Sequence, residues 1–362
     1  MFELGKRYPV NGTFELTGRC NLSCKMCLVR VDQKRIGELG LRERTADEWI
    51  RMAEQARDAG TLGLLLTGGE VMLRPDFCEI YEAIAKMGFL LTVYTNATMV
   101  TDEVMRVLEK APPHKIGVTM YGASNETYRR LCGCAGGYER FCEGVRRLTD
   151  LPSLFDIRTT IVSDNLKDLE EMRVFTEKNF GSDKVLHISR SVVNSIRGGV
   201  AYPKRVRLTP EQNVSLIYPW LGGFGKKVLS GEARVQKDMP KLNLKRHQMP
   251  EDGQYMFANC GAGIVQYTIS WAGRMYACGM LTQGYTEPFE QGFWKAWESL
   301  PRQYPPGRIP EPCASCKYAA LCESCPADRL AETGDWYGVP EYACREAECV
   351  YQELSELDIL RM

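Results

Sequence analysis

The first two hundred residues alternate between short apolar runs and longer amphipathic segments. The apolar runs are rich in Leu, Ile, Val and Thr and have the length of buried strands, which predicts strands at 13–17, 62–67, 90–95, 115–121, 156–163 and 185–189. The segments between them place apolar residues at helical spacing. One of them opens on Thr45, with Glu48 three residues later, and closes on Gly60, which is the pattern of a capped helix.

Six strand–helix units predict an α/β fold with a parallel sheet, because parallel strands need a crossover connection and a helix usually supplies it. Six units are fewer than the eight of a closed α/β barrel, so we expect a partial (β/α)6 barrel. In such folds the chemistry collects at the carboxyl ends of the strands.

The alternation ends near residue 200, and the rest of the chain has a different composition. Residues 201–255 carry many Pro and Gly residues among basic and polar ones, which indicates a bridging segment. Residues 256–362 hold eight of the fifteen cysteines and little periodicity, apart from a helix-like stretch at 349–362. We therefore expect a barrel at 1–200, a bridge at 201–255, and a small irregular cysteine-rich iron–sulfur domain at 256–362.

Composition argues against some classes of binding partner and indicates where the protein is located. Lys plus Arg and Asp plus Glu both number 46, so the net charge is zero, whereas proteins that neutralise nucleic-acid phosphates are usually basic. The N-terminal residues do not resemble a signal peptide, and no window has the unbroken apolar length of a membrane span. We expect a cytoplasmic protein that binds neither nucleic acid nor membrane.

Fifteen cysteines in a cytosolic chain indicate metal binding, because that compartment keeps thiols reduced. Only three histidines are present, and none lies beside a cysteine cluster, which argues against mixed Cys/His zinc sites. Zinc or iron–sulfur sites made of cysteine alone remain.

Cys20, Cys24 and Cys27 lie within eight residues of one another, just after the first predicted strand. They therefore occupy the first strand–helix loop, at the catalytic face of the predicted barrel. Four ligands close a metal site, whereas a four-iron cluster held by three cysteines leaves one iron open. A zinc knuckle completed by a distant cysteine is the alternative, although no partner cysteine lies at ordinary zinc spacing.

This CxxxCxxC loop resembles the signature of the radical S-adenosylmethionine (SAM) superfamily. A second similarity is the run of Gly68, Gly69 and Glu70 after the second predicted strand, where glycines allow close backbone approach and a carboxylate can hold a ligand ammonium. The resemblance implies that the open iron binds SAM. It also implies that an electron from the reduced cluster yields a 5'-deoxyadenosyl radical, which abstracts a substrate hydrogen.

The resemblance implies further SAM contacts. Asn96 corresponds to a polar residue near the ribose, Thr119 to a Ser or Thr at the methionine end, and Arg158 to a partner of the methionine carboxylate. Each also has an ordinary structural interpretation: a turn cap, a β-branched strand residue and a surface charge, respectively. Met26 stands where the family usually has an aromatic residue against adenine, a contact that a thioether can also make.

The C-terminal cysteines have metal-site spacing of their own, with two CxxC pairs five residues apart. In an isolated domain this pattern favours zinc. Attached to a radical SAM barrel it resembles the SPASM extension, which holds up to two auxiliary four-iron clusters. The resemblance assigns Cys313, Cys316, Cys322 and Cys344 to an outer cluster and Cys260, Cys278 and Cys325 to an inner one.

The expected cofactors are therefore SAM and three 4Fe–4S clusters. Cys344 fits the last outer ligand better than Cys349, and Gln254 stands where some members carry an eighth ligand, which leaves room for an open inner iron. Cys78 and Cys142 lie in helical patterns and are interpreted as buried small residues. The sequence does not choose among the remaining candidates near strand ends or the mouth of the site: Tyr94, Tyr121, Cys132, Cys134, Arg190 and Arg197.

SPASM enzymes mostly modify peptides or proteins, and Gly279 after Cys278 differs from the Asp typical of sulfatase-oxidising members. The resemblance therefore favours a peptide substrate and crosslinking, thioether formation or epimerisation. Nineteen residues precede Cys20, so we expect any leader peptide to be bound by a separate protein or by the barrel, with a flavodoxin or ferredoxin as reductant. A haem-precursor or other small-molecule oxidoreductase and a zinc-stabilised binding protein stay open as alternatives.

Overall fold

The computed structural model describes residues 7–189, 192–216, 255–257 and 260–356. The chain divides into two compact units, one made of 1–207 and 261–304 and the other of 208–260 and 305–362. Arg190 and Gln254, which the sequence analysis singled out, lie outside the described residues. No helix in these described ranges is both long and apolar enough to cross a membrane.

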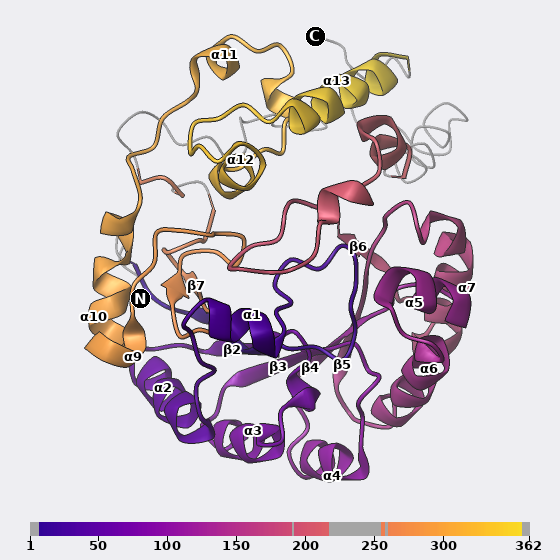
Figure 1. Cartoon of the computed structure of the whole chain (residues 1–362), viewed down its shortest axis with the longest axis vertical. Helices are drawn as coiled ribbons and strands as arrows, with labels where there is room; N and C mark the ends of the chain where they lie inside the picture. Colours follow the sequence, from indigo (N-terminus) through magenta and orange to yellow (C-terminus); the bar gives the residue numbers. More distant parts are fainter. Residues whose placement is uncertain (1–6, 190–191, 217–254, 258–259, 357–362) are drawn as a thin grey trace. The chain divides into compact units, whose positions relative to one another are not determined.

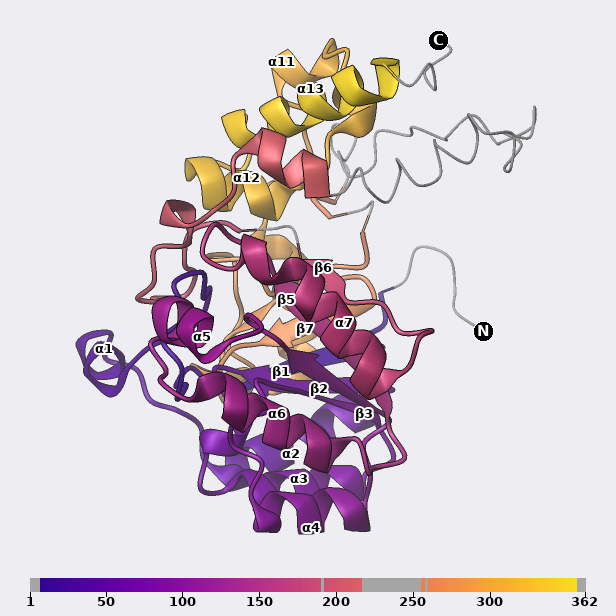
Figure 2. The same ribbon diagram turned by 90° about the vertical axis from the view of Figure 1, so that its right-hand side faces the viewer.

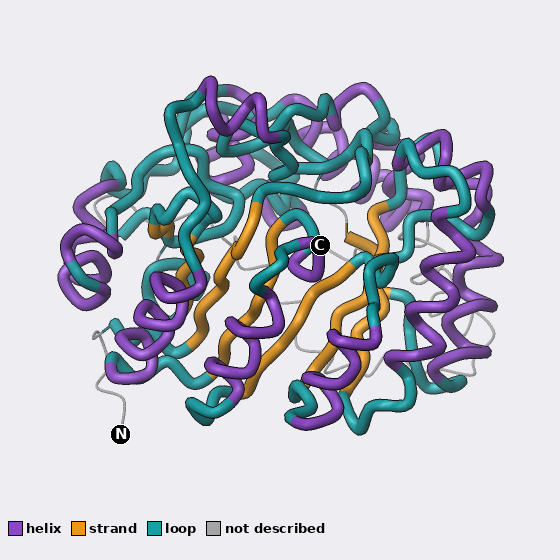
Figure 3. Tube along the Cα trace, turned by 60° about the horizontal axis from the view of Figure 1, so that its bottom comes forward, coloured by secondary structure: helices purple, strands orange, loops and turns teal. Residues whose placement is uncertain are grey.

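An eight-stranded sheet forms the centre of the first unit (Figures 1 and 3). Its strands are β1 (Asn11–Thr17), β2 (Gly63–Gly68), β3 (Leu90–Thr95), β4 (Lys115–Thr119), β5 (Leu154–Thr160), β6 (His187–Ser189), β7 (Gln266–Ile269) and β8 (Met275–Tyr276). They are ordered β6-β5-β4-β3-β2-β1-β7-β8, and all neighbours are parallel except β7 and β8. The six predicted strands match β1 to β6 to within a few residues, which confirms the α/β parallel sheet.

Helices follow the strands along the chain of the first unit and, apart from α1, cover one face of the sheet (Figures 1 and 2). They are α1 (Gln33–Glu38), α2 (Ala46–Asp58), α3 (Phe77–Ala85), α4 (Asp102–Lys110), α5 (Asn125–Cys132), α6 (Gly137–Leu148), α7 (Leu169–Phe180), α9 (Pro288–Gln291) and α10 (Phe293–Ser299). Phe14 of β1 is fully buried, and its ring centroid lies 5.1 Å from that of Trp49 on α2. Since side chains alternate along a strand, Glu15 and Thr17 face the other side of the sheet, away from the helices.

Helix α2 shows how the local sequence fixes an element. The Thr45 side chain accepts a hydrogen bond from the Glu48 backbone N–H at 3.3 Å, and the Glu48 carboxylate accepts one from the Thr45 N–H at 2.8 Å. The helix ends at Asp58, and Gly60 follows with a φ of 96°. The predicted capping box and glycine stop are both confirmed.

Residues 261–304, which the sequence analysis grouped with the C-terminal domain, belong to the first unit. The reason is that β7 pairs with β1 and extends the parallel sheet beyond the six predicted strands. The Tyr267 ring on β7 packs against Phe293 and Trp297 of α10, with centroids 5.1 and 6.0 Å apart. This pairing covers the edge that β1 otherwise leaves open.

In its described part, the second unit contains α11 (Glu311–Ala314), α12 (Pro326–Thr333) and α13 (Glu341–Glu356), and residues 210–216 are helical as well. The sequence analysis predicted that the last helix starts at Cys349. In the structure α13 begins eight residues earlier, at Glu341. The earlier turns are stabilised by tertiary contacts, since the Tyr342 hydroxyl donates to the Leu208 carbonyl at 3.0 Å and Ala347 is buried. The remainder of the predicted helix, 357–362, lies outside the described residues.

Candidate functional site

The first three cysteines lie in the loop that leaves the carboxyl end of β1, as the sequence predicts. Helix α5 anchors this loop, because the Ser23 N–H donates to the Cys132 carbonyl at 2.7 Å and the Lys25 N–H donates to the Leu131 carbonyl at 3.0 Å. These carbonyls belong to the last turn of the helix, which has no intrahelical partners for them. The end of α5 therefore fixes the path of the chain between Cys20 and Cys27.

Backbone amides point at the sulfur atoms of this loop. The Leu22 N–H donates to Cys20 Sγ, and the Arg30 N–H donates to Cys27 Sγ, both at 3.3 Å. Such donors stabilise negative sulfur and are one of the features that tune protein-bound iron–sulfur clusters. The donor set of this loop therefore fits a cluster held by three thiolates.

Without metal, the same thiols are held protonated. Burial raises the pKa of Cys20 well above its ordinary range and raises that of Cys27 to about 11. Hydrogen bonding with Cys132 and burial raise the pKa of Cys24, while Tyr121 and Arg30 oppose this shift. Metal ions must therefore displace protons here, and the affinity for a cluster depends on pH.

A hydrogen-bond network surrounds the first cysteine. The Asn96 side-chain amide donates to Cys20 Sγ at 3.6 Å and to Asn21 Oδ1 at 3.0 Å. Asn96 Oδ1 accepts from the Thr98 hydroxyl at 2.6 Å, and Asn21 Nδ2 donates to the same hydroxyl at 2.8 Å. The structure thus places Asn96 against a proposed cluster ligand, and its contact with a ribose stays a prediction.

The close approach of the cysteine loop requires glycine at two positions, Gly68 at the end of β2 and Gly69 directly after it. A Cβ on Gly68 would collide with the Thr17 carbonyl, and one on Gly69 would collide with the Arg19 carbonyl. The Gly69 N–H donates to the Thr17 carbonyl at 2.8 Å. Because Gly68 also has a φ of 143°, a side chain at this position would be strained as well as crowded.

Glu70 is fully buried and connects the ends of β2 and β3. Its Oε1 accepts from the Thr95 hydroxyl at 2.9 Å and from the Met72 N–H at 3.1 Å, and its Oε2 accepts from the Asn96 N–H at 2.7 Å. Burial raises the pKa of this carboxyl. The carboxylate positions Asn96, which in turn contacts Cys20, while a role in holding an ammonium group stays a prediction.

The other expected SAM contacts are distributed over neighbouring strands. Thr119, the last residue of β4, pairs in register with Arg158 on β5. The Arg158 guanidinium lies 4.8 Å from the Tyr94 ring centroid, and its Nε lies 3.6 Å from an Asp156 carboxylate oxygen. Met26 is buried. Arg158 is thus held in place by β3 and β5 and is more than a solvated surface charge.

Four cysteines of the second set lie close together in the second unit. Burial and the neighbouring Cys322, Cys313 and Cys316 raise the pKa of Cys344, so these four thiols lie within electrostatic range of one another. Cys349 lies elsewhere on α13, where its thiol approaches Glu211 at 3.8 Å. The four residues that the family resemblance assigned to the outer cluster are therefore near one another.

The three inner-cluster candidates are divided between the units. Cys278 belongs to the first unit, and Cys260 and Cys325 belong to the second. Met280 donates its N–H to Cys278 Sγ and Asp328 donates its N–H to Cys325 Sγ, both at 3.4 Å. Both sulfurs therefore have the same kind of amide donor as the first loop.

No group of three or more His, Cys, Asp or Glu side chains in the described part of the chain is arranged to hold a single metal ion. In a four-iron cluster each thiolate binds a different iron, so the ligands stand farther apart than around one ion. Cluster binding by these cysteines is therefore supported by their spacing along the chain, the backbone N–H donors to their sulfur atoms, and the effect of neighbouring thiols on the pKa of Cys344.

The family model of the Radical SAM superfamily matches residues 14–175. The chain contains a radical SAM domain. It is 26% identical over 357 residues to the AdoMet-dependent heme synthase of Methanosarcina barkeri, covering 94% of this chain and 95% of that protein. It is 27% identical over 343 residues to the mycofactocin maturase MftC of Mycobacterium ulcerans, covering 89% and 84%, respectively.

The fold of the radical SAM enzyme is similar to that of Streptococcus suis SuiB in its crystal structure with the precursor peptide SuiA. The TM-score is 0.67 at 16% sequence identity, over 93% of this chain and 76% of SuiB. This likeness concerns the fold. The family assignment replaces the zinc-stabilised binding protein as an interpretation.

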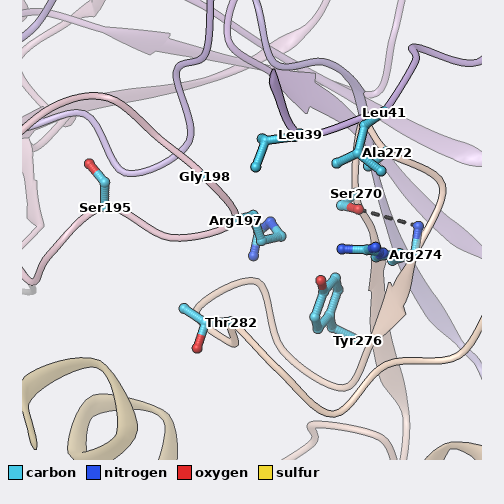
Figure 4. A pocket seen from close by; sticks show the side chains of 10 residues that line it. All are labelled: Leu39, Leu41, Ser195, Arg197, Gly198, Ser270, Ala272, Arg274, Tyr276 and Thr282. Atoms are coloured by element: carbon cyan, nitrogen blue, oxygen red, sulfur yellow. Dashed lines mark hydrogen bonds between the residues drawn. The ribbon is translucent and has the colours of Figure 1, made fainter. Parts of the chain in front are cut away.

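The first unit of the radical SAM enzyme contains a cavity of about 330 Å³ (Figure 4). It is lined by Leu39, Leu41, Ser195, Arg197, Gly198, Ser270, Ala272, Arg274, Tyr276 and Thr282. The Ser195 hydroxyl donates to the Cys27 carbonyl at 3.0 Å. Arg197 donates to the Gly279 carbonyl at 2.5 Å and to the Leu281 carbonyl at 3.1 Å. The cavity walls are thus connected to the first cysteine loop and to the loop after Cys278.

Several contacts near the site could not be derived from the sequence, although Cys132 itself was among the candidates. Cys132 contacts Cys24 only because the end of α5 packs on the cysteine loop. Arg30 follows the third cysteine by three residues, and nothing in the spacing shows that its charge lowers the pKa of both Cys24 and Cys27. Arg274 lies in the hairpin between β7 and β8, which the sequence analysis did not recognise as part of the barrel.

Proposed function

We propose that this radical SAM enzyme modifies a peptide, and that it abstracts hydrogen from an unactivated carbon before a bond forms or a centre inverts. The cavity in the first unit supports this proposal. Ligand pockets span roughly 300–1,000 Å³, and about 330 Å³ suits one or two amino-acid side chains better than a tetrapyrrole macrocycle. None of the described residues that line it is a His, Cys or Met, the usual axial ligands of haem-type iron.

Relatives named for peptide chemistry also support a peptide substrate. Besides the mycofactocin maturases, the PqqA peptide cyclase of Rhizobium meliloti is 30% identical over 164 residues, covering 45% of this chain and 43% of that protein. A second candidate function, chemistry on a haem precursor, is favoured by the heme synthase relative, which matches nearly the whole chain.

In this proposal Cys20, Cys24 and Cys27 hold the SAM-binding cluster, and the amides of Leu22 and Arg30 orient its sulfurs. When bound, the reduced cluster supplies the electron that cleaves SAM into methionine and a 5'-deoxyadenosyl radical. The barrel residues position SAM and exclude water from the radical.

The SAM contacts that we propose all lie at the carboxyl end of the sheet or in the cysteine loop. Gly68 and Gly69 expose backbone at the end of β2, and Glu70 holds the start of the loop after β3. Arg158, half-buried beside Tyr94, offers a cation for the methionine carboxylate. The remaining proposed contacts are Met26, Asn96 and Thr119.

We also propose two auxiliary clusters. Cys313, Cys316, Cys322 and Cys344 would hold the outer one, and Cys260, Cys278 and Cys325 the inner one, within a C-terminal cluster-binding region. The electron donor is proposed to be a flavodoxin or ferredoxin, and a separate protein is proposed to bind the leader of the peptide substrate. A cytoplasmic location agrees with fifteen cysteines that no disulfide occupies in the described structure.

Anaerobic reconstitution tests the proposal. We expect about twelve irons per chain, a spectrum of the reduced protein that changes when SAM is added, and 5'-deoxyadenosine after reduction. Absence of 5'-deoxyadenosine would refute the radical chemistry.

The substrate is tested with two compounds in parallel. One is a candidate precursor peptide encoded beside the gene, deuterated at all carbon positions, and the other is an iron porphyrin with free propionates. We expect deuterium in 5'-deoxyadenosine from the peptide. If only the porphyrin changes mass during turnover, the haem-precursor alternative is correct and the peptide proposal is wrong.

A further inference from the structure

The β7–β8 hairpin forms one wall of the cavity and contributes polar and charged side chains to it. Figure 4 shows Ser270, Arg274 and Tyr276 together on this wall, with Arg197 beside them. The Arg274 backbone N–H donates to the Ser270 hydroxyl at 3.3 Å, and the Ser270 N–H donates to the Arg274 carbonyl at 2.8 Å. These bonds close the hairpin turn and fix the position from which the Arg274 side chain starts.

The Arg274 guanidinium is also held at its far end. It lies 4.3 Å from the Tyr285 ring centroid, which is a favourable distance for a cation–π contact. Burial raises the pKa of the Tyr276 hydroxyl on the same hairpin, and Tyr276 lies near enough for the Arg274 charge to oppose this larger effect. An arginine that is stacked in this way loses little additional freedom when it binds a ligand.

The charges around the cavity do not balance. Arg197 forms a buried ion pair with Glu15 of β1, which neutralises its charge. Arg274 has no carboxylate partner among the residues that the structure describes, and no Asp or Glu lines the cavity. Serine, threonine and tyrosine hydroxyls supply further donors. The cavity thus presents one uncompensated cation surrounded by neutral hydrogen-bonding groups, which is the complement of a single anionic group.

The cavity is also connected to the proposed chemistry. Ser195 on one wall donates to the carbonyl of Cys27, the third ligand of the proposed SAM-binding cluster. Arg197 on another wall donates to the Gly279 carbonyl, next to Cys278. A group bound here is therefore held by the same backbone segments that position the cysteine loops.

We propose that this cavity binds the carboxylate of an acidic residue of the peptide substrate, with Arg274 as the principal contact. The inference deepens the proposed function, since it names the class of residue that the peptide must present. Planar guanidinium and carboxylate groups form paired hydrogen bonds, so Arg274 selects an Asp or Glu side chain over its amide counterpart.

The test uses the reconstituted full-length enzyme and two capped tripeptides, N-acetyl-Gly-Glu-Gly amide and N-acetyl-Gly-Gln-Gly amide. Phenylglyoxal modifies accessible arginines, and mass spectrometry follows the rate at Arg274. We expect the Glu tripeptide, and not the Gln tripeptide, to slow this reaction. Arg308 is the internal control, because it is exposed, stacks on Tyr337 at 5.7 Å and lies outside the cavity, so its rate should not change.

Variants give a second, independent measurement by ligand-observed NMR. Arg274→Gln should weaken binding of the Glu tripeptide at least about tenfold, while Arg308→Gln should leave it unchanged. Arg274→Lys keeps the charge without the planar fork and should fall between these two variants. Thermal unfolding of each variant checks that the fold is intact, and the protection measurement on the unmodified chain does not depend on any variant.

The outcomes separate this inference from the proposed function. Equal protection by both tripeptides, or none, overturns carboxylate binding even if 5'-deoxyadenosine forms normally. Protection of Arg274 by an iron porphyrin with free propionates, and not by the Glu tripeptide, assigns the carboxylate to a tetrapyrrole and overturns the inference. Absence of 5'-deoxyadenosine refutes the proposed radical chemistry and leaves the binding result standing.

Discussion

The two sets of cysteines in this protein are built in opposite ways. Cys20, Cys24 and Cys27 come from one loop, whose backbone is held by helix α5 and packs closely against Gly68 and Gly69 at the end of β2. The second set is spread along the chain from Cys260 to Cys344, with Cys278 in the first compact unit and the other six proposed ligands in the second. A site made by one loop survives changes elsewhere in the chain, whereas a site made by distant segments depends on the fold that brings them together.

The two sets nevertheless share a local device. Cysteines of both sets accept hydrogen bonds from backbone amides two or three residues later, as at Cys20 and Cys325. Each set also has a nearby arginine, Arg30 beside the first and Arg329 beside the outer group of the second. We therefore expect the two sets to depend on different parts of the fold. In both sets, backbone N–H groups and a nearby arginine should stabilise the negative charge on sulfur.

The largest expected effect comes from Cys24→Ala. The variant should lose about four of about twelve irons and all 5'-deoxyadenosine formation, because the open cluster has no other ligand in its loop. Iron analysis and chromatography of the reaction products measure the two effects. Cys142→Ala, on helix α6, is the matched control and should keep both; an equal loss in the control would mean that the iron content does not report on the loop.

A comparison within α13 tests the second set. Cys344→Ala should lose about four irons and lower the unfolding temperature, since metal binding and folding are coupled in ligand-dense regions. Cys349→Ala should keep its iron and change the free energy of unfolding by about 1 kcal/mol. Iron content and thermal melting measure both. If instead Cys349→Ala loses iron and Cys344→Ala keeps it, Cys349 is the last ligand of the outer cluster.

A smaller effect is expected from the two arginines. Arg30→Gln removes a positive charge near Cys24 and Cys27, so the reduction potential of the SAM-binding cluster should become more negative. Arg329→Gln should do the same to the outer cluster alone. A redox titration followed by electron paramagnetic resonance measures both, with the SAM-sensitive signal marking the first cluster. Equal shifts of both clusters in each variant would contradict the assignment of one arginine to each set.

The smallest effect concerns neither set and serves as a control for the barrel. Hydrogen bonds from Arg42 lower the pKa of Glu48, so its charged form stabilises the fold above its ordinary pKa of 4.5 and this contribution disappears as the pH falls. Glu48→Gln should therefore cost about 1 kcal/mol at neutral pH and less in acid. Denaturant unfolding at two pH values measures this, and cluster content should be unchanged. A cost that does not diminish in acid would show that the carboxylate charge is not responsible.

Much of the fold could be predicted, because the relevant signals are local. The strand at 90–95 matches β3, and the capping box at Thr45 and Glu48 is present, since both depend on residues within one element. The pairing of β7 with β1 was not predicted, because β7 is four residues long and no local pattern shows which strand it joins. The cavity wall with Arg274 follows from that pairing and was missed with it.

The sequence by itself determined the parallel α/β barrel, the loop that carries three cysteines, and the spacing of the C-terminal CxxC pairs. These features are encoded by periodicity and by distances along the chain, which the backbone converts directly into geometry. Only the tertiary structure decided that Asn96 contacts Cys20, that Cys344 lies within electrostatic range of Cys313, Cys316 and Cys322, and that Arg274 lines a cavity with no acidic partner among the described residues. Each of these contacts joins segments far apart along the chain, and the packing of side chains between elements is what brings them together.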